Sequence, residues 1–180
     1  MNAIDCIKGR RSVRKFKDDP IPHEVMDRIV ETASYSPSWK NSQVPRYMVI
    51  EDKAVIDKLG SECVLGFEYN TNTLKNAHTL VLINAVTKRS GYEKDGSYTT
   101  SKEDRWEMFD AGIASQTFCL AAYEEGLGTV IMGIFDEDKV GKVVDIPEGQ
   151  RFIAVIAIGY PDEDPKMPRR KPVEELVTYL

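Results

Sequence analysis

The sequence predicts a single α+β domain, on three observations. The 180-residue chain is long enough to bury one core, and its 42% hydrophobic and 29% charged residues are ordinary for a globular protein. Helix-like and strand-like patterns follow one another without a repeat or an internal linker. Residues 161–180 are charged and contain prolines, but have no core of their own. We therefore expect residues 1–180 to form one domain whose C-terminal tail, 161–180, packs on something else.

In the first half of the chain, apolar residues at helical spacing predict helices, and continuous apolar runs predict strands. The helix at 20–33 has Pro22 and Glu24 in its first turn, which favours a helix start there. The polar stretch 36–45 contains two prolines and is expected to be a loop. Residues 61–76 remain open between a loop and a helix. The other predicted elements are helices at 2–9 and 53–60 and strands at 46–52 and 78–86.

The second half of the chain follows the same rules. Residues 87–101 are rich in Gly, Ser and Thr, and we expect a mobile or disordered insertion or lid there. Small residues fill the centre of the helix expected at about 102–125, so a partner backbone can approach closely. We expect Gly126 to cap that helix and Asp136 to cap the helix at 136–144. The remaining predicted elements are strands at 128–133 and 151–161.

The sequence lacks the motifs and residue spacings of most kinds of catalytic site. His23 and His78 have no metal-ligand spacing with each other or with a cysteine, so no metal site is expected. No motif typical of a metalloprotease, a serine hydrolase or a phosphate-binding loop occurs. The glycines of GLGTVIMG, at 126–133, miss the dinucleotide-binding spacing and run from a helix into a strand. An enzyme with this sequence therefore needs a cofactor to supply the reactivity.

The bulk properties indicate where such a protein works. Cys6, Cys63 and Cys119 form no C-x-x-C pair, which indicates reduced thiols and a cytoplasmic location. No apolar run is long enough to cross a membrane, and the N-terminal residues lack the pattern of a signal peptide. The net charge of −5 argues against a nucleic acid as the partner.

The stretch RRSVRKF, at 10–16, contrasts with this acidic balance. With its flanks it gathers cationic side chains and no acid, namely Lys8, Arg10, Arg11, Arg14, Lys15 and Lys17. One interpretation is a solvated helix end whose Lys and Arg side chains complement the helix dipole. The other interpretation is a binding site for a small anion. A second cationic run, Arg169, Arg170 and Lys171, stands near the other end of the chain.

Five stretches in this order along the chain occur together in one known protein family. They are RRSVRKF at 10–16, SPSWKNSQ at 36–43, the small-residue helix at 110–129, GIFDEDKVGKVVDIPEG at 133–149 and IAIGYPDEDPKMPRRKPVEELV at 156–177. On these stretches the chain resembles the FMN-dependent nitroreductase family nearly from end to end. The resemblance implies a nitroreductase-like α+β fold, in which helices flank a central, mostly antiparallel sheet. It also implies an intertwined homodimer in which residues 161–180 wrap the partner subunit.

The resemblance implies that FMN binds with its phosphate at the two cationic runs. A phosphate monoester carries about two negative charges, and Arg guanidinium groups match its oxygens bidentately. The residues implied at the phosphate and ribityl end are Arg10, Arg11 and Ser12 from the first run and Arg169 and Arg170 from the second. Arg14 is implied at the ribityl chain or the flavin ring.

Two further segments are implied at the isoalloxazine ring. In the family, the loop after the second helix reaches the flavin of the other subunit; here its residues would be Pro37, Ser38, Trp39, Asn41 and Gln43. The strand end that passes over the flavin face matches Ile131, Met132 and Gly133. Both segments also have purely structural interpretations, an ordinary polar turn and plain core packing of Met132. Where many members read Gln-Pro-Trp, this chain reads Gln43-Val44-Pro45-Arg46.

The family's chemistry implies ping-pong hydride transfer from NADH or NADPH, by way of FMN, to a nitro compound, a quinone or a similar small-molecule acceptor. No side chain is then the catalyst, because the reaction takes place at the flavin N5. The alternative is an FMN-binding relative with another redox task, such as dehalogenation, dehydrogenation or flavin handling. A third interpretation is a non-enzymatic dimer whose cationic runs bind an acidic partner protein.

Overall fold

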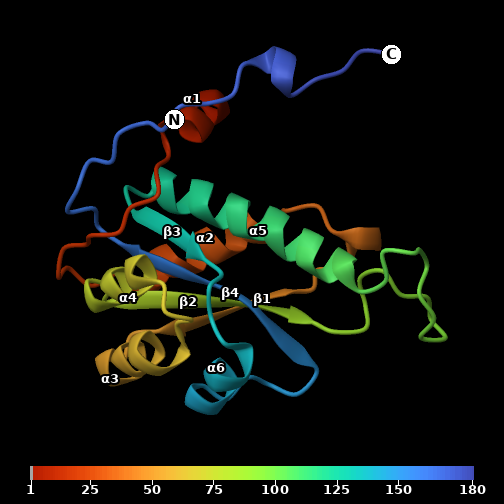
Figure 1. Ribbon diagram of the computed structural model, residues 1–180, viewed down its shortest axis with the longest axis horizontal. Helices are drawn as coiled ribbons and strands as arrows, with labels where there is room; N and C mark the ends of the chain where they lie inside the picture. The colour runs from red at the N-terminus through yellow and green to blue at the C-terminus, as the bar shows by residue number, and fades with distance from the viewer. Residues whose placement is uncertain (1) are drawn as a thin grey trace.

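A computed structural model describes residues 2–180 and contains a four-stranded antiparallel sheet in the order β1-β2-β4-β3. Its strands are β1 (Pro45–Ile50), β2 (Thr79–Val86), β3 (Gly128–Met132) and β4 (Gln150–Gly159). Figure 1 shows helices on both faces of this sheet. The predicted α+β class and antiparallel sheet are therefore confirmed.

One face of the sheet is covered by α2 (His23–Ser34) and α5 (Arg105–Glu124). Because side chains alternate along a strand, Val81 and Ile83 of β2 pack against these two helices. Phe118 of α5 is fully buried in the same cluster. Burying a side chain such as Ile or Phe contributes about 1.5–3 kcal/mol, so this cluster holds α5 firmly on the sheet.

The opposite face is covered by shorter helices. They are α3 (Lys53–Lys58), α4 (Glu68–Lys75) and α6 (Glu137–Val143). Leu80 and Leu82, the alternate residues of β2, pack in this second cluster. A π-helical turn at Leu59–Cys63 continues α3. The stretch at 61–76 that the sequence left open is thus the end of this turn, a short connection and α4.

The predicted helix caps are observed. Gly126 follows α5 with φ at +80°, a left-handed conformation that favours glycine. Asp136 precedes α6, and its side chain accepts a hydrogen bond at 3.1 Å from the backbone N–H of Lys139. Both helix ends were predictable because each depends on only a few neighbouring residues.

The segment 87–101 folds back on itself between β2 and α5. The Thr99 N–H donates to the Gly91 carbonyl at 2.9 Å, and the Glu93 N–H donates to the Ser97 carbonyl at 2.8 Å. Tyr92 and Tyr98 pair across the turn. The expectation of disorder is therefore wrong, because the segment's short polar side chains and glycines bond and turn its own backbone. The expected role as an insertion or lid stays a prediction.

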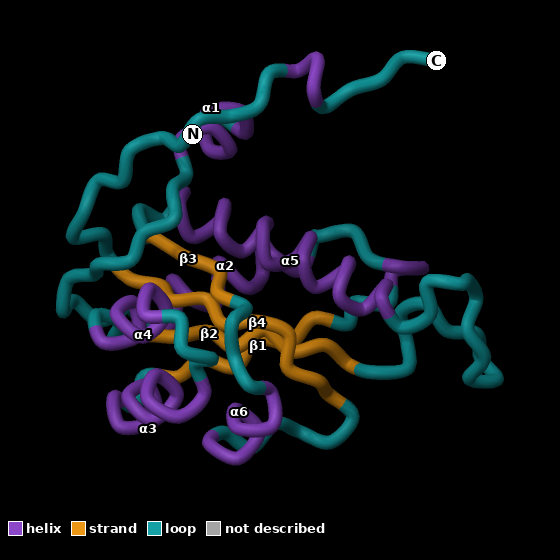
Figure 2. The backbone as a smooth tube through the Cα atoms, viewed as in Figure 1, coloured by secondary structure: helices purple, strands orange, loops and turns teal. Residues whose placement is uncertain are grey.

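Both ends of the chain leave the body of the protein on the same side, as Figure 2 shows for α1 (Ala3–Gly9) and the tail. The tail has one short 3-10 turn, Val173–Glu175. Its apolar side chains find little cover in the chain, with Leu176 68% and Tyr179 89% exposed. Packing of the tail on a partner subunit stays a prediction.

Candidate functional site

The first cationic run is positioned by hydrogen bonds to two strand ends. The Val13 N–H donates to the Thr129 carbonyl of β3 at 3.0 Å. Further along, the Lys17 N–H donates to the Tyr160 carbonyl, just after β4, at 2.9 Å. The backbone from 12 to 17 is thereby fixed along the edge of the sheet, and the cationic side chains project from a defined frame.

Two glycines allow this segment to lie so close to the sheet. A Cβ atom at Gly128 would lie 2.7 Å from the Val13 side chain, and one at Gly159 would lie 3.0 Å from Phe16. Any larger residue at Gly128 would push the segment away from β3, since a contact of 2.7 Å is shorter than van der Waals packing allows. The position of the arginines therefore depends on residues distant from them in the sequence.

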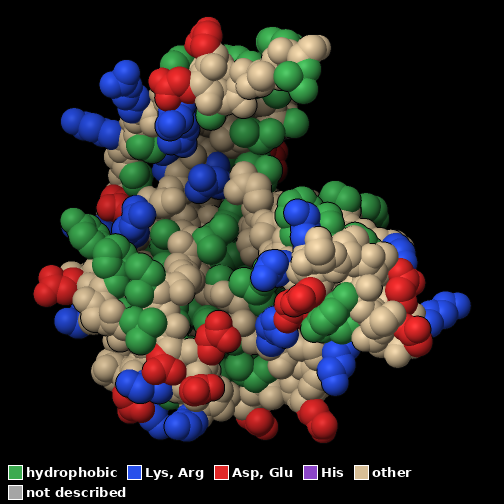
Figure 3. Space-filling view, turned by 45° about the vertical axis from the view of Figure 1, so that its right-hand side comes forward, with side chains coloured by type: hydrophobic (Ala, Val, Ile, Leu, Met, Phe, Trp, Pro, Cys, Tyr) green, Lys and Arg blue, Asp and Glu red, His purple; other side chains and the backbone are tan. Residues whose placement is uncertain are grey.

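The first cationic run and the tail enclose a cavity of about 280 Å³. The residues that line it are Arg10, Arg11, Ser12, Arg14, Pro165, Lys166, Pro168 and Arg170. The Asp162 N–H donates to the Lys15 carbonyl at 3.0 Å, which leads the tail back along the segment. Figure 3 shows Lys and Arg side chains gathered where the lobe of α1 and the tail meets the body. The two cationic runs thus come together in space.

The arginines of this cationic cavity differ in their own contacts. Arg11 Nη1 donates to three backbone carbonyls at the end of α1, at 2.7–3.0 Å, and so satisfies acceptors that a helix end leaves open. Arg10 Nε, in contrast, is buried and has no hydrogen-bond partner among the described residues. A buried donor without a partner costs about 1–3 kcal/mol, and an acceptor that reached Arg10 Nε would offset this cost.

A second, largely apolar cavity of about 540 Å³ adjoins the first at Arg14, which lines both. Its other lining residues are Phe67, Tyr69, Asn70, Val130, Ile131, Met132, Gly133 and Ile134. Asn70 is buried, and its Nδ2 has no partner in the described part of the chain. Ile131 is 45% exposed at the end of β3, so an apolar surface is open to a ligand there.

Eight residues that line these cavities were not among the predicted site residues, and four of them have aromatic or polar side chains, namely Phe67, Tyr69, Asn70 and Lys166. Phe67, Tyr69 and Asn70 stand at or just before the start of α4, in the stretch that the sequence left open. The available signal was FEYN at 67–70, two aromatic residues beside an amide. Lys166 lies in the tail, where its charge was one among many and no motif marked it.

Most of the predicted site residues line these two adjoining cavities, but two groups do not. Arg169 is exposed and lies outside both lining sets. The loop at 37–43 lies elsewhere, since Pro37, Ser38 and Gln43 line a separate cavity of about 640 Å³ beside α2 and β1. Within one chain, the loop and the cationic cavity are therefore apart.

The 38–43 loop has a left-handed backbone without glycine. Three of its residues have positive φ, namely Lys40 (+47°), Asn41 (+55°) and Gln43 (+48°). Such values are uncommon for residues other than glycine, and they concentrate at functional sites. Trp39 packs on Trp106 of α5 with 4.7 Å between ring centroids, which fixes one side of the loop.

The three cysteines are not arranged as nucleophiles. Cys6, Cys63 and Cys119 are free and buried, as expected for reduced thiols. Burial raises the pKa of each of these thiols, so each remains protonated at neutral pH. Burial also raises the pKa of Tyr47, beside the third cavity, to about 12.

Two other kinds of feature are absent from residues 2–180. No group of three or more His, Cys, Asp or Glu side chains there is placed to hold a metal ion. Among the helices that the structure describes, none has the length and apolar character to span a membrane.

Known proteins share this fold and sequence pattern. The family model described as the nitroreductase family matches residues 7–75 and 66–160. A Methanothermobacter thermautotrophicus protein named for NADH dehydrogenase/NAD(P)H nitroreductase activity is 31% identical, over 92% of this chain and 80% of its own. An iodotyrosine deiodinase from Thermotoga neapolitana is 28% identical over 97% of each chain. A Desulfovibrio desulfuricans structure described as a nitroreductase in complex with FMN superimposes with a TM-score of 0.77 at 25% identity, covering 100% of this chain and 98% of that one.

Proposed function

The chain belongs to the nitroreductase family, and from this premise we propose that it is an FMN-dependent oxidoreductase. It would use NADH or NADPH as the reductant and reduce nitro compounds, quinones or similar small electrophiles by a ping-pong mechanism. The free, buried thiols fit a reducing compartment, and we place the protein in the cytoplasm.

The observation that carries the proposal is the junction of two cavities at Arg14. FMN joins a phosphate with about two negative charges to a flat, largely apolar ring through a ribityl chain. A cationic cavity that continues into a largely apolar one matches the two ends of this molecule in order. Each cavity also has one buried donor without a partner, Arg10 Nε and Asn70 Nδ2, and FMN has acceptors at both ends.

The chain's own residues would bind and orient the cofactor. Arg10 and Arg170 would make charge-assisted hydrogen bonds to the phosphate, and Arg14 would lie between phosphate and ring. Gly133 has nothing within 4 Å of where a Cβ would stand, so the ring edge could approach its backbone closely. Bound FMN supplies the two-electron chemistry at its N5 atom.

We further propose that the site is completed by a second copy of the chain. The 37–43 loop does not reach the cationic cavity of its own chain, but could reach the ring held by a partner. Contiguous exposed apolar surface often marks an interaction site, and the large apolar side chains that this chain exposes include Ile4, Ile7, Phe109, Leu176 and Tyr179. A C₂ homodimer with the tail wrapped around the partner would cover such surfaces and form two shared FMN sites.

The similarity to a deiodinase supports one alternative, an FMN-binding protein with a different redox task such as dehalogenation, dehydrogenation or flavin handling. Phe67 and Tyr69 line the apolar cavity, with 5.4 Å between their ring centroids. Rings in this position would stack on a planar acceptor whether it carries a nitro group or a halogen. The geometry of the cavity is thus compatible with both tasks.

The test is a titration of the purified protein with FMN, followed by NADH and NADPH oxidation in the presence of nitroaromatics, quinones and iodophenols. We expect tight FMN binding and turnover with nitroaromatics or quinones. Failure to bind FMN at micromolar concentrations would remove the proposal. Turnover of the iodophenols alone would instead support the alternative.

A further inference from the structure

Asp110 of α5 is a buried carboxylate that collects hydrogen bonds from two separate loops. Its side chain is only 2% exposed. It accepts from the backbone N–H of Trp39, at 3.1 Å to Oδ1 and 3.0 Å to Oδ2. Oδ2 also accepts from the hydroxyls of Ser42, at 3.2 Å, and Ser90, at 2.7 Å. One side chain therefore links the 38–43 loop to α5 and to the start of the 87–101 segment.

The 38–43 loop needs such a tie because its backbone conformation is unfavourable by itself. Lys40, Asn41 and Gln43 all have positive φ, which costs energy in residues with a Cβ atom. Conformations of this kind persist only where surrounding contacts determine them. The bonds from Trp39 and Ser42 to Asp110 lie on both sides of Lys40 and Asn41, so they hold the strained turn at its two ends.

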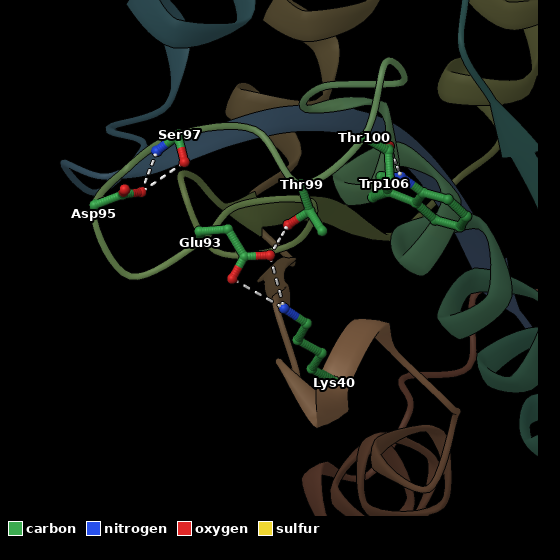
Figure 4. Close-up of polar contacts among 7 residues, drawn as sticks. All are labelled: Lys40, Glu93, Asp95, Ser97, Thr99, Thr100 and Trp106. Carbon is green, nitrogen blue, oxygen red and sulfur yellow. Dashed lines mark hydrogen bonds and ion pairs between the residues drawn. The ribbon is translucent and has the colours of Figure 1, made fainter.

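The 87–101 segment provides a second contact to the same loop. Figure 4 shows Lys40 pointing from the loop to Glu93 of the segment, and their Nζ and Oε1 atoms are 3.1 Å apart. Trp106 packs on Trp39 and donates from Nε1 to the Thr100 hydroxyl at 2.9 Å. The Lys40–Glu93 pair is largely exposed, and exposed ion pairs contribute little. The buried bonds at Asp110 are therefore the stronger link.

We propose that Asp110 is a positioning residue for the flavin site. It holds the Ser38–Gln43 loop in its left-handed conformation and couples that loop to Ser90. This inference rests on the proposed function, in which the loop presents its donors to the isoalloxazine ring of the partner's FMN. The 87–101 segment then stabilises the loop, through Ser90 at Asp110 and through Glu93 at Lys40.

The test uses Asp110→Asn and an optical signal that needs no cofactor. Trp39 and Trp106 are the only two tryptophans of the chain, and they pack on each other at the loop. Asparagine preserves the size of the side chain but replaces one acceptor oxygen with a donor amide. In FMN-free protein we expect a shifted tryptophan emission. In titrations we expect the FMN dissociation constant to rise about tenfold and the visible flavin band to shift.

Two matched variants separate this role from general damage to α5. Ser115→Ala removes a buried hydroxyl on the same helix, which donates to the Ala111 carbonyl at 2.7 Å, and should leave all three signals unchanged. Lys40→Met removes the exposed ion pair with Glu93 and the ammonium 5.6 Å from the centre of the Trp39 ring, and it should weaken FMN binding much less than Asp110→Asn. If Asp110→Asn fails to fold, Ser42→Ala with Ser90→Ala removes two donors and leaves Asp110 in place.

The outcomes distinguish this inference from the proposed function. Unchanged tryptophan emission in Asp110→Asn, or in the double serine variant where the former does not fold, would overturn the positioning role. Shifted emission with unchanged FMN affinity and flavin band would overturn the link between the loop and the flavin. Absence of FMN binding by the wild-type protein would overturn the proposed function, while the emission would still decide whether Asp110 holds the loop.

Discussion

The two segments that we propose to contact FMN, 10–16 and 38–43, are held in opposite ways. In the first, the backbone is extended and bonded to strand ends, and Arg10 and Arg14 form no ion pair within residues 2–180. In the second, the backbone itself is strained and a buried carboxylate, Asp110, fixes it. We propose that the first segment offers its charge to an anion, whereas the second offers its shape to a planar ring.

The largest effect on FMN affinity should come from removing the positive charge of an arginine at the cationic cavity. Arg10→Ala or Arg170→Ala removes a charge-assisted hydrogen bond worth about 1.5–3 kcal/mol, so FMN affinity should fall by about one to two decades for each residue. Fluorescence titration with FMN measures this, and thermal melting checks that the variants remain folded. Lys142→Ala, an exposed cation on α6, serves as the control and should bind FMN normally. Unchanged affinity in both arginine variants would reduce the cationic runs to surface charge.

The next largest effect on FMN affinity should come from the backbone packing that positions the arginines. Gly128→Ala puts a Cβ 2.7 Å from Val13, and overpacking of this kind costs about 1–3 kcal/mol. We expect a lower melting temperature and weaker FMN binding, because the displaced segment carries the arginines. The double variant Gly128→Ala/Val13→Gly should be more stable than the sum of the single effects predicts, because Val13→Gly removes the Cβ and both γ carbons that the new Cβ would meet. Simple additivity in this cycle would mean that the two residues do not meet.

A smaller effect on the cofactor should follow from loss of the partner. Deleting residues 173–180 leaves the cationic cavity intact but removes the apolar end of the tail, including Leu176 and Tyr179. We expect sedimentation to show a shift towards monomer, together with an FMN affinity about tenfold weaker because the partner's 38–43 loop is lost. A wild-type protein that sediments as a monomer with FMN fully bound would show that the second segment is not supplied in trans.

The smallest effect should come from the other buried acid of α5, Glu107, which accepts from the Lys88 N–H at 2.6 Å. Burial raises the pKa of this carboxyl, so the folded state binds the proton more tightly than the unfolded state. The stability from this group is complete below about pH 4.3 and is lost as the pH rises through the folded pKa. The free energy of unfolding of Glu107→Gln should therefore increase relative to that of the wild type as the pH rises, by at most about 1.4 kcal/mol per pH unit.

Thermal melts of the Glu107→Gln variant and the wild type at several pH values measure this gain. Glu148→Gln changes an exposed acid and should follow the wild type at every pH. A constant difference between Glu107→Gln and the wild type across the pH range would show that burial does not raise this pKa.

The secondary structure of this protein was determined largely by its local sequence. The strand β2 is apolar on both faces, with Leu80 and Leu82 on one and Val81 and Ile83 on the other. A strand of this kind is expected inside a sheet that has helices on both sides, because both of its faces must be buried. Gly126 and Asp136 end and begin helices for reasons that lie within a few residues of them. The 87–101 segment shows the limit, because Gly, Ser and Thr suit both a disordered chain and a loop that bonds to itself.

The site was decided by the tertiary structure. Arg10 and Arg170 stand at opposite ends of the sequence, and only the positions of β3 and β4 bring their segments to one cavity. Asn70 joins that site from a stretch without a clear pattern, and Asp110 looks in the sequence like an ordinary helix residue. The physical reason is that helix caps and strand faces depend on short-range sterics and hydrogen bonds. Cavities and buried polar bonds depend instead on which distant backbones the sheet order places side by side.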